Sequence, residues 1–258
     1  MRMILVCVDY GDLLEFTLPY NRHHFDDAMI VTSPGDLVTQ NIALENHCQL
    51  HITDAFYRDG ADFNKWRALE EGLDIFGRRG IICIMDADIL WPKVIPQWVV
   101  NHDHLYTPMR RMMENIEHLR SVNVPPETLW STFPLHRQQA EWAGYTQIFH
   151  GDDSHLGATP WHETNWSHAG GADSFFQAKW PKERKLRPPF EVLHLGTCGE
   201  NWFGRSTQMV DGSIPRDSEE RKHKFYAIWQ QRRDNKANGI PEFTNEKIPQ
   251  GQVPKGDC

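Results

Sequence analysis

The chain has 258 residues, of which 40% are hydrophobic and 24% are charged, a composition typical of one domain with a substantial core. Asp and Glu outnumber Lys and Arg by 35 to 27, so the formal net charge is -8. Proteins that bind a phosphate backbone usually carry a basic surface, so this balance disfavours a nucleic-acid partner.

The five cysteines are scattered along the chain, at positions 7, 48, 83, 198 and 258. Their number is odd and two of them lie within apolar runs, a pattern that indicates a reducing compartment. The apolar start MRMILVCV ends at Asp9, too early for a signal-peptide core or a membrane span. We therefore expect a cytoplasmic protein, bacterial or viral, without a membrane span.

Short apolar runs alternate with helical patterns in the first third of the chain, and we expect strands at residues 4–8, 28–33, 49–53 and 81–85. A helix is predicted over residues 64–77, because Leu69, Leu73 and Phe76 share one helical face and Gly80 follows. Strands that are apolar throughout are typical of a parallel sheet covered on both faces. The predicted fold class is therefore α/β, with a mostly parallel central sheet flanked by helices.

Thr107 and Pro108 predict the start of another helix, as an N-cap followed by proline at the first helical position. The apolar stripe of this helix would comprise Met109, Met112, Met113, Ile116 and Leu119. Beyond residue 211 the sequence predicts an amphipathic helix and then a poorly packed tail rich in proline, glycine and charge. We expect one domain over residues 1–210 and a C-terminal extension over residues 211–258.

Residues 144–168 combine aromatic, histidine and acidic side chains without a period, which indicates a binding loop. Aromatic faces bind sugars well, so a sugar or acceptor site would be lined by Trp161, His162, Trp166 and His168. A less favoured alternative, because the H-E-x-x-H spacing is missing, is a zinc site formed by His150, Asp152, His155 and His162.

Polar residues follow three predicted strands where each ends: Asp9-Tyr10, Thr32-Ser33 and Asp86-Ala87-Asp88. Parallel strands end at the same edge of a sheet, where ligands bind in open α/β folds. Asp86 and Asp88 are two residues apart in an extended segment, so both carboxylates can face one side while Ala87 packs behind. Two adjacent negative charges favour a hard cation such as Mg²⁺ or Mn²⁺, whereas a solvated strand end is the alternative.

Four stretches occur in the order seen in one enzyme family: VDYGD (8–12), FNKWRALEEGL (63–73), MDADILWP (85–92), and GGADSFFQAKW (170–180) with VLHLG (192–196). Together they resemble a nucleotide-sugar-dependent glycosyltransferase of the GT-A fold, over roughly residues 3–205. The resemblance implies transfer of a sugar from a nucleoside diphosphate sugar, with UDP-sugars favoured, to a hydroxyl. The acceptor would be a glycan, a small molecule, a protein or a hydroxymethylated base of viral DNA.

Carried over by position, the resemblance places Asp86, Asp88 and His194 around a Mn²⁺ or Mg²⁺ ion, with Asp88 as the more direct ligand. Asp173 would act as the general base of an inverting reaction. Many relatives have two acidic residues where this chain has Ala172 and Asp173, and an aspartate in the first turn of a helix is the alternative.

The nucleotide would be held by Asp9, Tyr10, Lys65, Arg67, Asp86 and Arg205. An aromatic ring and a carboxylate suit a base and ribose, and cations stabilise the charge of a leaving diphosphate. The alternatives are a solvated helix face for Lys65 and Arg67, a structural cap for Arg205, and turn chemistry for Asp36.

Two other functional classes use the same pattern. A nucleotidyltransferase also carries paired aspartates, although no glycine-rich phosphate loop lies near residue 10. A non-catalytic sugar-binding module would keep the aspartates only as a polar strand end.

Overall fold

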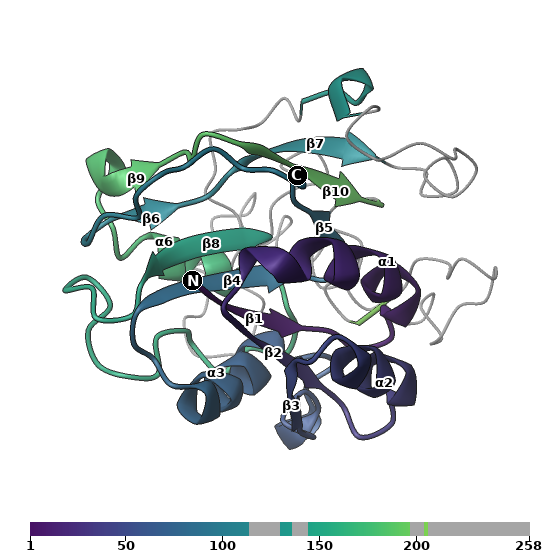
Figure 1. Ribbon diagram of the computed structural model, residues 1–258. Helices are drawn as coiled ribbons and strands as arrows, with labels where there is room; N and C mark the ends of the chain where they lie inside the picture. Colours follow the sequence, from purple (N-terminus) through teal and green to yellow (C-terminus); the bar gives the residue numbers. More distant parts are fainter. Residues whose placement is uncertain (114–129, 136–143, 197–203, 206–258) are drawn as a thin grey trace, which may run out of the picture.

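The computed structural model describes residues 1–113, 130–135, 144–196 and 204–205 (Figure 1). The predicted boundary at residue 210, the extension over residues 211–258, and Ile116 and Leu119 of the predicted central helix lie outside these residues.

The strands are β1 (Arg2–Val6), β2 (Asp27–Thr32), β3 (Gln49–Ile52), β4 (Ile81–Asp86), β5 (Ile89–Leu90), β6 (Leu105–Tyr106), β7 (Met109–Met113), β8 (Thr146–His150), β9 (Lys185–Leu186) and β10 (Glu191–Leu195). The α-helices are α1 (Gly11–Asn21), α2 (Leu37–Glu45), α3 (Lys65–Phe76) and α6 (Ala172–Gln177). Short 3-10 helices span Arg22–His24, Arg58–Gly60, Trp130–Thr132 and Lys182–Arg184.

A seven-stranded sheet in the order β3-β2-β1-β4-β8-β6-β9 forms the centre of the molecule (Figure 1). Strand β8 runs antiparallel to both of its neighbours, and the other described pairs of this sheet are parallel. A second sheet has the order β5-β10-β7, in which β10 is antiparallel to β5 and parallel to β7. The predicted α/β class with a mostly parallel, helix-flanked sheet is confirmed.

The order of the strands reverses between β1 and β4. From β1 the chain proceeds outward through β2 to β3, and it then returns to place β4 on the other side of β1. The carboxyl ends of two such strands open a crevice, because their connections leave in opposite directions. Val6 of β1 is in register with Asp86 of β4, so both strands end at the same edge of the sheet.

Each face of the sheet is buried by helices, because successive strand residues point to opposite sides. Helix α3 covers one face in a cluster that includes Ile4, Val31 and Leu69. The other face packs Leu5 and Ile30 in a cluster with residues of α1 and α2. Burial on both sides explains why these strands are apolar throughout.

The expected elements of the first third of the chain are confirmed with small shifts. The predicted helix 64–77 is α3, and the predicted strand 81–85 is β4. Strand β1 begins and ends two residues before the predicted range 4–8, so Asp9 lies in the loop after the strand.

The helix predicted from Thr107 is wrong, since β7 occupies Met109–Met113. The spacing of Met109, Met112 and Met113 fits a helical face, but these residues pair in parallel with β10 along their whole length. A non-local strand partner overrides local propensity here, as it often does for short segments. Arg110, which the helix prediction left out of the apolar stripe, is buried in this strand.

The expectation of a binding loop over residues 144–168 is wrong for its first part. Residues 146–150 form β8, between β4 and β6. Apolar and polar residues do not alternate along this strand, because four of its five residues are buried, including the polar Thr146 and Gln147.

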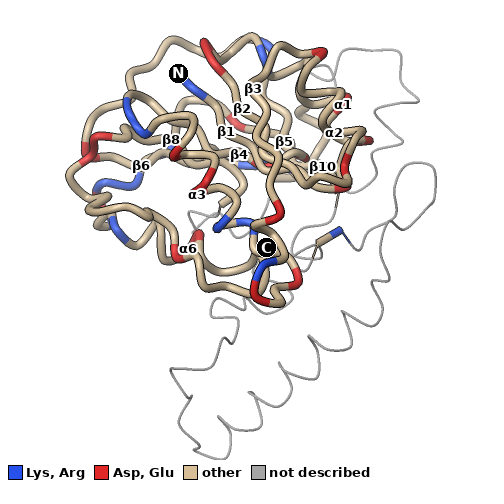
Figure 2. Tube along the Cα trace, turned by 90° about the horizontal axis from the view of Figure 1, so that it is seen from below, with Lys and Arg blue, Asp and Glu red and all other residues tan. Residues whose placement is uncertain are grey.

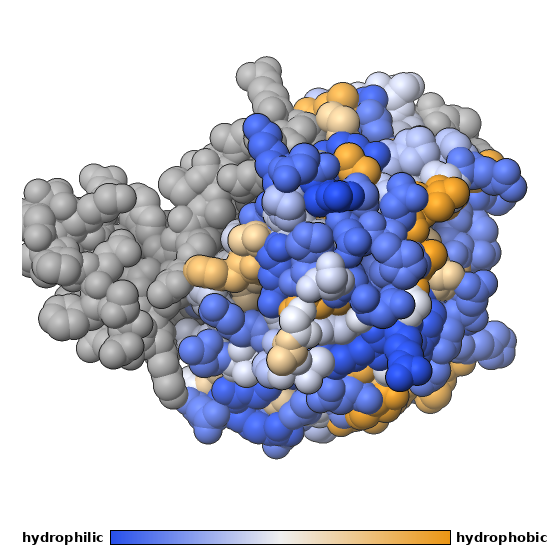
Figure 3. Space-filling model, turned by 90° about the vertical axis from the view of Figure 1, so that its left-hand side faces the viewer, coloured by the Kyte–Doolittle hydropathy of each residue, from blue (hydrophilic) through white to orange (hydrophobic). Residues whose placement is uncertain are grey.

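Acidic and basic residues are interspersed along the described chain (Figure 2). The face seen in Figure 3 is mostly hydrophilic, with apolar residues in small separate groups. Within the described ranges, no helix has the length and apolar character needed to cross a membrane.

Candidate functional site

The segment Asp86-Ala87-Asp88 joins β4 of the large sheet to β5 of the small sheet, at the edge where β1 and β4 end. Asp86 is the last residue of β4, and its backbone N–H donates to the carbonyl of Tyr145 across 3.0 Å. Asp88 precedes β5, and its carbonyl accepts from the backbone N–H of Leu195 across 2.8 Å. Ala87 packs in the core on the α1 side, as predicted. Backbone bonds on both sides therefore hold the two carboxylates in place.

Asp86 faces Lys65, the first residue of α3. The Lys65 ammonium forms an ion pair with Oδ1 of Asp86, and Lys65 is 9% exposed. Asn64 caps the helix by accepting from the backbone N–H of Arg67, which fixes the point where α3 starts. Burial raises the pKa of Asp86, with Lys65 opposing this change and Asp88 adding to it.

Asp88 faces His194 on β10. Nε2 of His194 lies 3.3 Å from Oδ2 of Asp88, and Nδ1 lies 3.2 Å from Nη1 of Arg110. A guanidinium only donates, so Nδ1 accepts and the ring proton is on Nε2, directed at the carboxylate. Burial acts to raise the pKa of Asp88, but His194 outweighs it and the pKa is lowered.

The second oxygen of Asp88, Oδ1, is buried and has no hydrogen-bond partner among the described residues. A buried carboxylate oxygen without a partner is costly, and a bound cation or ordered water removes the cost. This oxygen fits the hard cation expected at the site. The predicted ligands Asp86, Asp88 and His194 are, however, not one of the described groups whose ligand atoms all lie within 4.8 Å.

The arrangement therefore divides the predicted metal ligands. Asp88 offers a free oxygen, Asp86 is engaged by Lys65, and Nε2 of His194 carries a proton toward Asp88. Ligation by Nε2 would place a proton on Nδ1, opposite the N–H of Arg110. Asp88 can therefore bind a cation as it stands. His194 can become a ligand through Nε2 only if Arg110 moves away from Nδ1.

Asp9 and Tyr10 lie in the loop between β1 and α1. Asp9 has a φ of 62°, and its backbone N–H donates to Oδ2 of Asp36 across 2.7 Å. Asp36 also caps α2 by accepting from Thr39, so its turn chemistry and its contact with Asp9 coexist. Burial raises the pKa of Tyr10, and the charges of Asp88 and Asp86 add to this, so the tyrosine lies near both carboxylates.

Arg205 is 3% exposed and ties the same loop together. Its guanidinium pairs with Asp12 and donates to the carbonyl of Asp9 across 3.1 Å. It also lies 4.7 Å from the ring centroid of Tyr10. These contacts make Arg205 a structural brace of the loop that presents Tyr10.

Arg67 points away from the carboxylate pair. Its guanidinium lies 3.1 Å from Asp59 and donates to the carbonyls of Arg58 and Thr164. Of the predicted cations, Lys65 forms an ion pair with the carboxylate pair, through Asp86.

Asp173 lies in the first turn of α6, after Gly171 with a φ of 97°. Its Oδ2 accepts from the backbone N–H of Gly144 across 2.8 Å, two residues before β8. The aspartate therefore fixes the approach of the chain to β8, and it is half-buried. This contact leaves the other oxygen, Oδ1, for further bonds.

The four residues predicted to line a sugar site are all buried: Trp161, His162, Trp166 and His168. His162 is stacked between the rings of Trp66 and Phe176, and its Nδ1 lies 2.6 Å from Glu70. These residues belong to the core beneath α3 rather than to an exposed platform. The sequence-based interpretation is wrong because aromatic rings serve a core as well as a sugar.

The zinc alternative formed by His150, Asp152, His155 and His162 is not assembled. His162 pairs with Glu70, and His155 lies 3.0 Å from Asp153. His150 and Asp152 do lie together, with His102 as a third partner.

Arg110 and Asp12 were missed by the sequence interpretation. Arg110 was assigned to a helix, where an arginine is normally solvated, and Asp12 was read only as part of VDYGD. A buried arginine between apolar residues is visible only once β7 and β10 are paired.

No protein-family model matches the sequence, and no curated protein matches it. Among solved structures, the chain is similar to glucosyl-3-phosphoglycerate synthase from Mycobacterium tuberculosis in complex with phosphoglyceric acid. The TM-score is 0.45 and the identity 12%, covering 75% of this chain and 71% of that chain. A complex of that synthase with Mn²⁺, UDP-glucose and phosphoglyceric acid has a TM-score of 0.44 and 13% identity, with 75% and 71% covered.

A structure described as a mycobacterial protein has a TM-score of 0.39 and 13% identity, covering 75% of this chain and 64% of that chain. The chain thus spans less than two thirds of that protein. At these scores and identities, the likeness says nothing about the roles of individual residues.

Proposed function

We propose that the chain is a metal-dependent glycosyltransferase that moves a sugar from a nucleoside diphosphate sugar to an acceptor hydroxyl. The observation that carries the proposal is the carboxylate pair at the sheet edge where β1 and β4 end, in which Oδ1 of Asp88 is buried without a partner among the described residues. Ligands of open α/β sheets bind at this kind of edge.

Asp88 is the proposed direct ligand of a Mn²⁺ or Mg²⁺ ion, and His194 orients its carboxylate through the Nε2 proton. When bound, the ion would offset the negative charge of a diphosphate leaving group. Lys65 keeps Asp86 from repelling the same diphosphate, because the ammonium neutralises that carboxylate.

Tyr10 and Asp9 are the proposed contacts of the nucleoside, since their loop lies beside the carboxylate pair. Arg205 stabilises this loop and Arg67 braces the residues near Asp59. We therefore propose indirect roles for both arginines. A uridine nucleotide is the first donor to test, in keeping with the motif resemblance.

Asp173 is the proposed general base of an inverting step. The acceptor hydroxyl oxygen forms a bond to the anomeric carbon as the bond from that carbon to the diphosphate oxygen breaks. The hydroxyl proton moves to the Asp173 carboxylate, and the nucleoside diphosphate leaves with the bonding electron pair. Gly144 holds Oδ2 of this carboxylate, so Oδ1 would receive the proton.

The first experiment measures thermal stabilisation of the full chain by nucleoside diphosphates and their sugars, with and without Mn²⁺. A ligand that binds only the folded state raises its apparent stability, by about 2.7 kcal/mol at a hundredfold excess over Kd. We expect one nucleotide to shift the wild type in the presence of metal and to lose that shift in Asp88→Asn. No shift with any nucleotide and metal would overturn the donor site.

A second experiment separates the reaction classes. Incubation with the stabilising nucleotide sugar and a panel of hydroxyl acceptors should release a nucleoside diphosphate. Release of pyrophosphate from a nucleoside triphosphate would instead indicate nucleotidyl transfer, and binding without turnover would indicate a sugar-binding module. Asp173→Asn should abolish turnover while preserving the stabilisation by the donor.

The acceptor class follows from the same panel, which should include glycans, small alcohols, a hydroxyl-bearing peptide and hydroxymethylated DNA. The excess of acidic residues disfavours DNA. We propose a cytoplasmic location, which the buried free thiols of Cys7, Cys48 and Cys83 support.

A further inference from the structure

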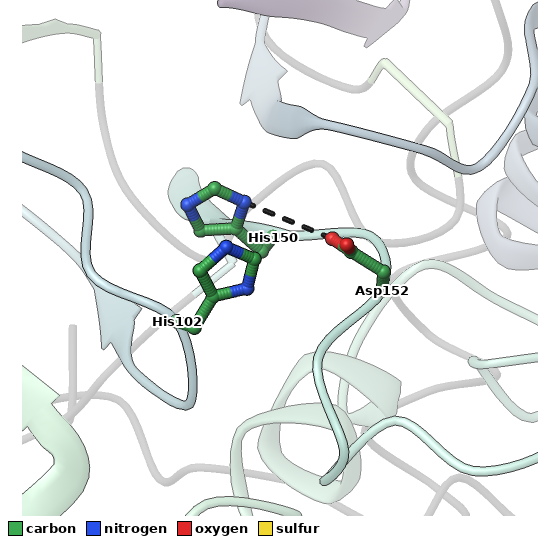
Figure 4. Close-up of side chains that lie close together, drawn as sticks. All are labelled: His102, His150 and Asp152. Carbon is green, nitrogen blue, oxygen red and sulfur yellow. Dashed lines mark ion pairs between the residues drawn. The ribbon is translucent and has the colours of Figure 1, made fainter.

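A second group of metal-ligand side chains lies where β8 ends. There β8 pairs with the first residue of β4, whereas the carboxylate pair lies beyond the last residue of β4. His150 is the last residue of β8, Asp152 follows in the next turn, and His102 comes from the segment before β6. The ligand atoms of these three residues all lie within 4.8 Å of one another (Figure 4).

The hydrogen bonds of His150 define its protonation. Nε2 lies 2.8 Å from the carbonyl oxygen of Val100, which can only accept, so Nε2 carries a proton. In the neutral ring, Nδ1 then has a lone pair, and this atom lies 3.7 Å from Oδ1 of Asp152. In the neutral ring two acceptors therefore face each other, at the two atoms that the dashed line in Figure 4 joins as an ion pair of the protonated ring.

A cation between the two atoms resolves this repulsion. A histidine that binds a metal typically donates its other N–H to a carbonyl or carboxylate, as His150 does to Val100. A proton on Nδ1, which would turn the contact into an ion pair, is the other solution. A metal titration distinguishes the two solutions, because only one of them needs an ion.

His102 supplies a third ligand from an exposed position. Its ring is stacked on that of His150, with centroids 3.7 Å apart and an interplanar angle of 17°. A metal lies in the plane of each imidazole that binds it, so His102 turns out of the stack to reach the ion. The ring is free to do so because the residue is exposed.

The neighbouring group of Asp103, Asp153 and His155 contrasts with this one. Oδ1 of Asp153 accepts from the backbone N–H and from the ring Nδ1–H of His155. Its Oδ2 accepts from the indole N–H of Trp180. Asp103 accepts from Ser154. These groups satisfy one another, so they form a structural network that does not call for an ion.

We propose that His102, His150 and Asp152 form a binding site for a divalent transition metal, with Zn²⁺ as the favoured ion. Two imidazoles and one carboxylate suit zinc, and water completes the tetrahedral shell. The ion joins the segment that leads into β6 to the end of β8. It therefore stabilises the edge half of the large sheet and is separate from the proposed sugar-transfer site.

The test is a Zn²⁺ titration of the full chain at alkaline pH, with Co²⁺ absorption as a report on imidazole ligands. His102→Ala and Asp152→Asn should each weaken one high-affinity site by about tenfold or more, because each removes a ligand. Both residues are exposed, so the variants keep the fold. Zn²⁺ should also slow hydrogen exchange of residues 100–104 in the wild type but not in His102→Ala or Asp152→Asn.

Two controls assign the site. Asp88→Asn should leave this affinity unchanged, which separates the ion from the one proposed at the carboxylate pair. His47→Asn removes an exposed imidazole elsewhere, and asparagine tolerates the φ of 54° at this position. Equal Zn²⁺ affinity in the wild type, His102→Ala and Asp152→Asn would overturn the proposal, as would loss of the site in Asp88→Asn.

Discussion

Arg110 donates to Nδ1 of His194 across 3.2 Å, and this contact fixes the proton of the imidazole on Nε2. The proton then points at Asp88, 3.3 Å away. The arginine is itself buried, on a strand that pairs with the strand of His194. The imidazole thus links Arg110 to the orientation of the Asp88 carboxylate.

The first prediction concerns this tautomer. In the metal-free wild type, imidazole ¹⁵N shifts should show His194 protonated on Nε2 and bare on Nδ1. Arg110→Met removes the donor and keeps the aliphatic stem, so the two tautomers should mix. Arg111→Met is the control, because Arg111 pairs with Glu191 rather than with the imidazole. A protonated Nδ1 in the wild type would contradict the assignment.

The second prediction concerns the ion pair of Lys65 and Asp86. Lys65→Met leaves a partly buried carboxylate without its counter-charge and should lower the free energy of unfolding by about 1–3 kcal/mol. In that background, Asp86→Asn should cost less than it does in the wild type, because it removes the uncompensated charge instead of breaking an ion pair. Urea unfolding of the four proteins measures the coupling, and additivity within about 0.5 kcal/mol would refute it.

The third prediction concerns acid sensitivity at Glu70 and His162. Burial lowers the pKa of His162, whereas burial acts to raise that of Glu70 and its bonds to His162 and Arg78 reverse this and lower it. Below about pH 6.5, the unfolded chain takes up a histidine proton that the folded chain refuses. Stability therefore falls as the pH falls through this range. The Glu70 contribution is present above its unfolded pKa and is lost at lower pH.

His162→Gln removes the titrating ring and should flatten this decline by up to about 1.4 kcal/mol per pH unit. It should also lower stability at pH 7 by about 1–3 kcal/mol, through lost stacking and hydrogen bonding. His47→Asn should keep the wild-type slope. Part of the decline remains in every variant, because burial also lowers the pKa of His24, to about 4. Equal slopes in the wild type and His162→Gln would reject this assignment.

The parts of the fold set by local pattern were predictable. Helix α3 shows a regular apolar face, and β4 is a continuous apolar run that ends in Asp86. Each signal lies within one segment and needs no knowledge of the partner. The position of the carboxylate pair at the sheet edge followed from the same reasoning.

The parts set by long-range pairing were not predictable. Met109–Met113 is a strand because β10 lies beside it, more than 80 residues later in the sequence. Trp161 and His162 are buried because Glu70 on α3 accepts from both of their backbone N–H groups. Composition identifies such residues as aromatic or basic but does not tell a core from a binding surface.

The final prediction concerns the contact of α3 with the sheet. Replacing a helical glycine by alanine normally stabilises a helix by up to about 1 kcal/mol. At Gly72, however, a Cβ atom would lie 2.6 Å from Cγ2 of Val31 and 3.0 Å from Cδ1 of Ile4. Gly72→Ala should therefore destabilise the protein by about 1–3 kcal/mol, because both side chains belong to packed strands.

Gly35→Ala is the matched control, since a Cβ atom there would meet nothing within 4 Å. This change should be neutral or stabilise the protein by about 0.4–1 kcal/mol, through a smaller entropy of the unfolded chain. Urea unfolding of both variants against the wild type measures the difference. If Gly72→Ala proves as stable as Gly35→Ala, α3 sits farther from β1 and β2 than the structure places it, and Lys65 would no longer be held against Asp86.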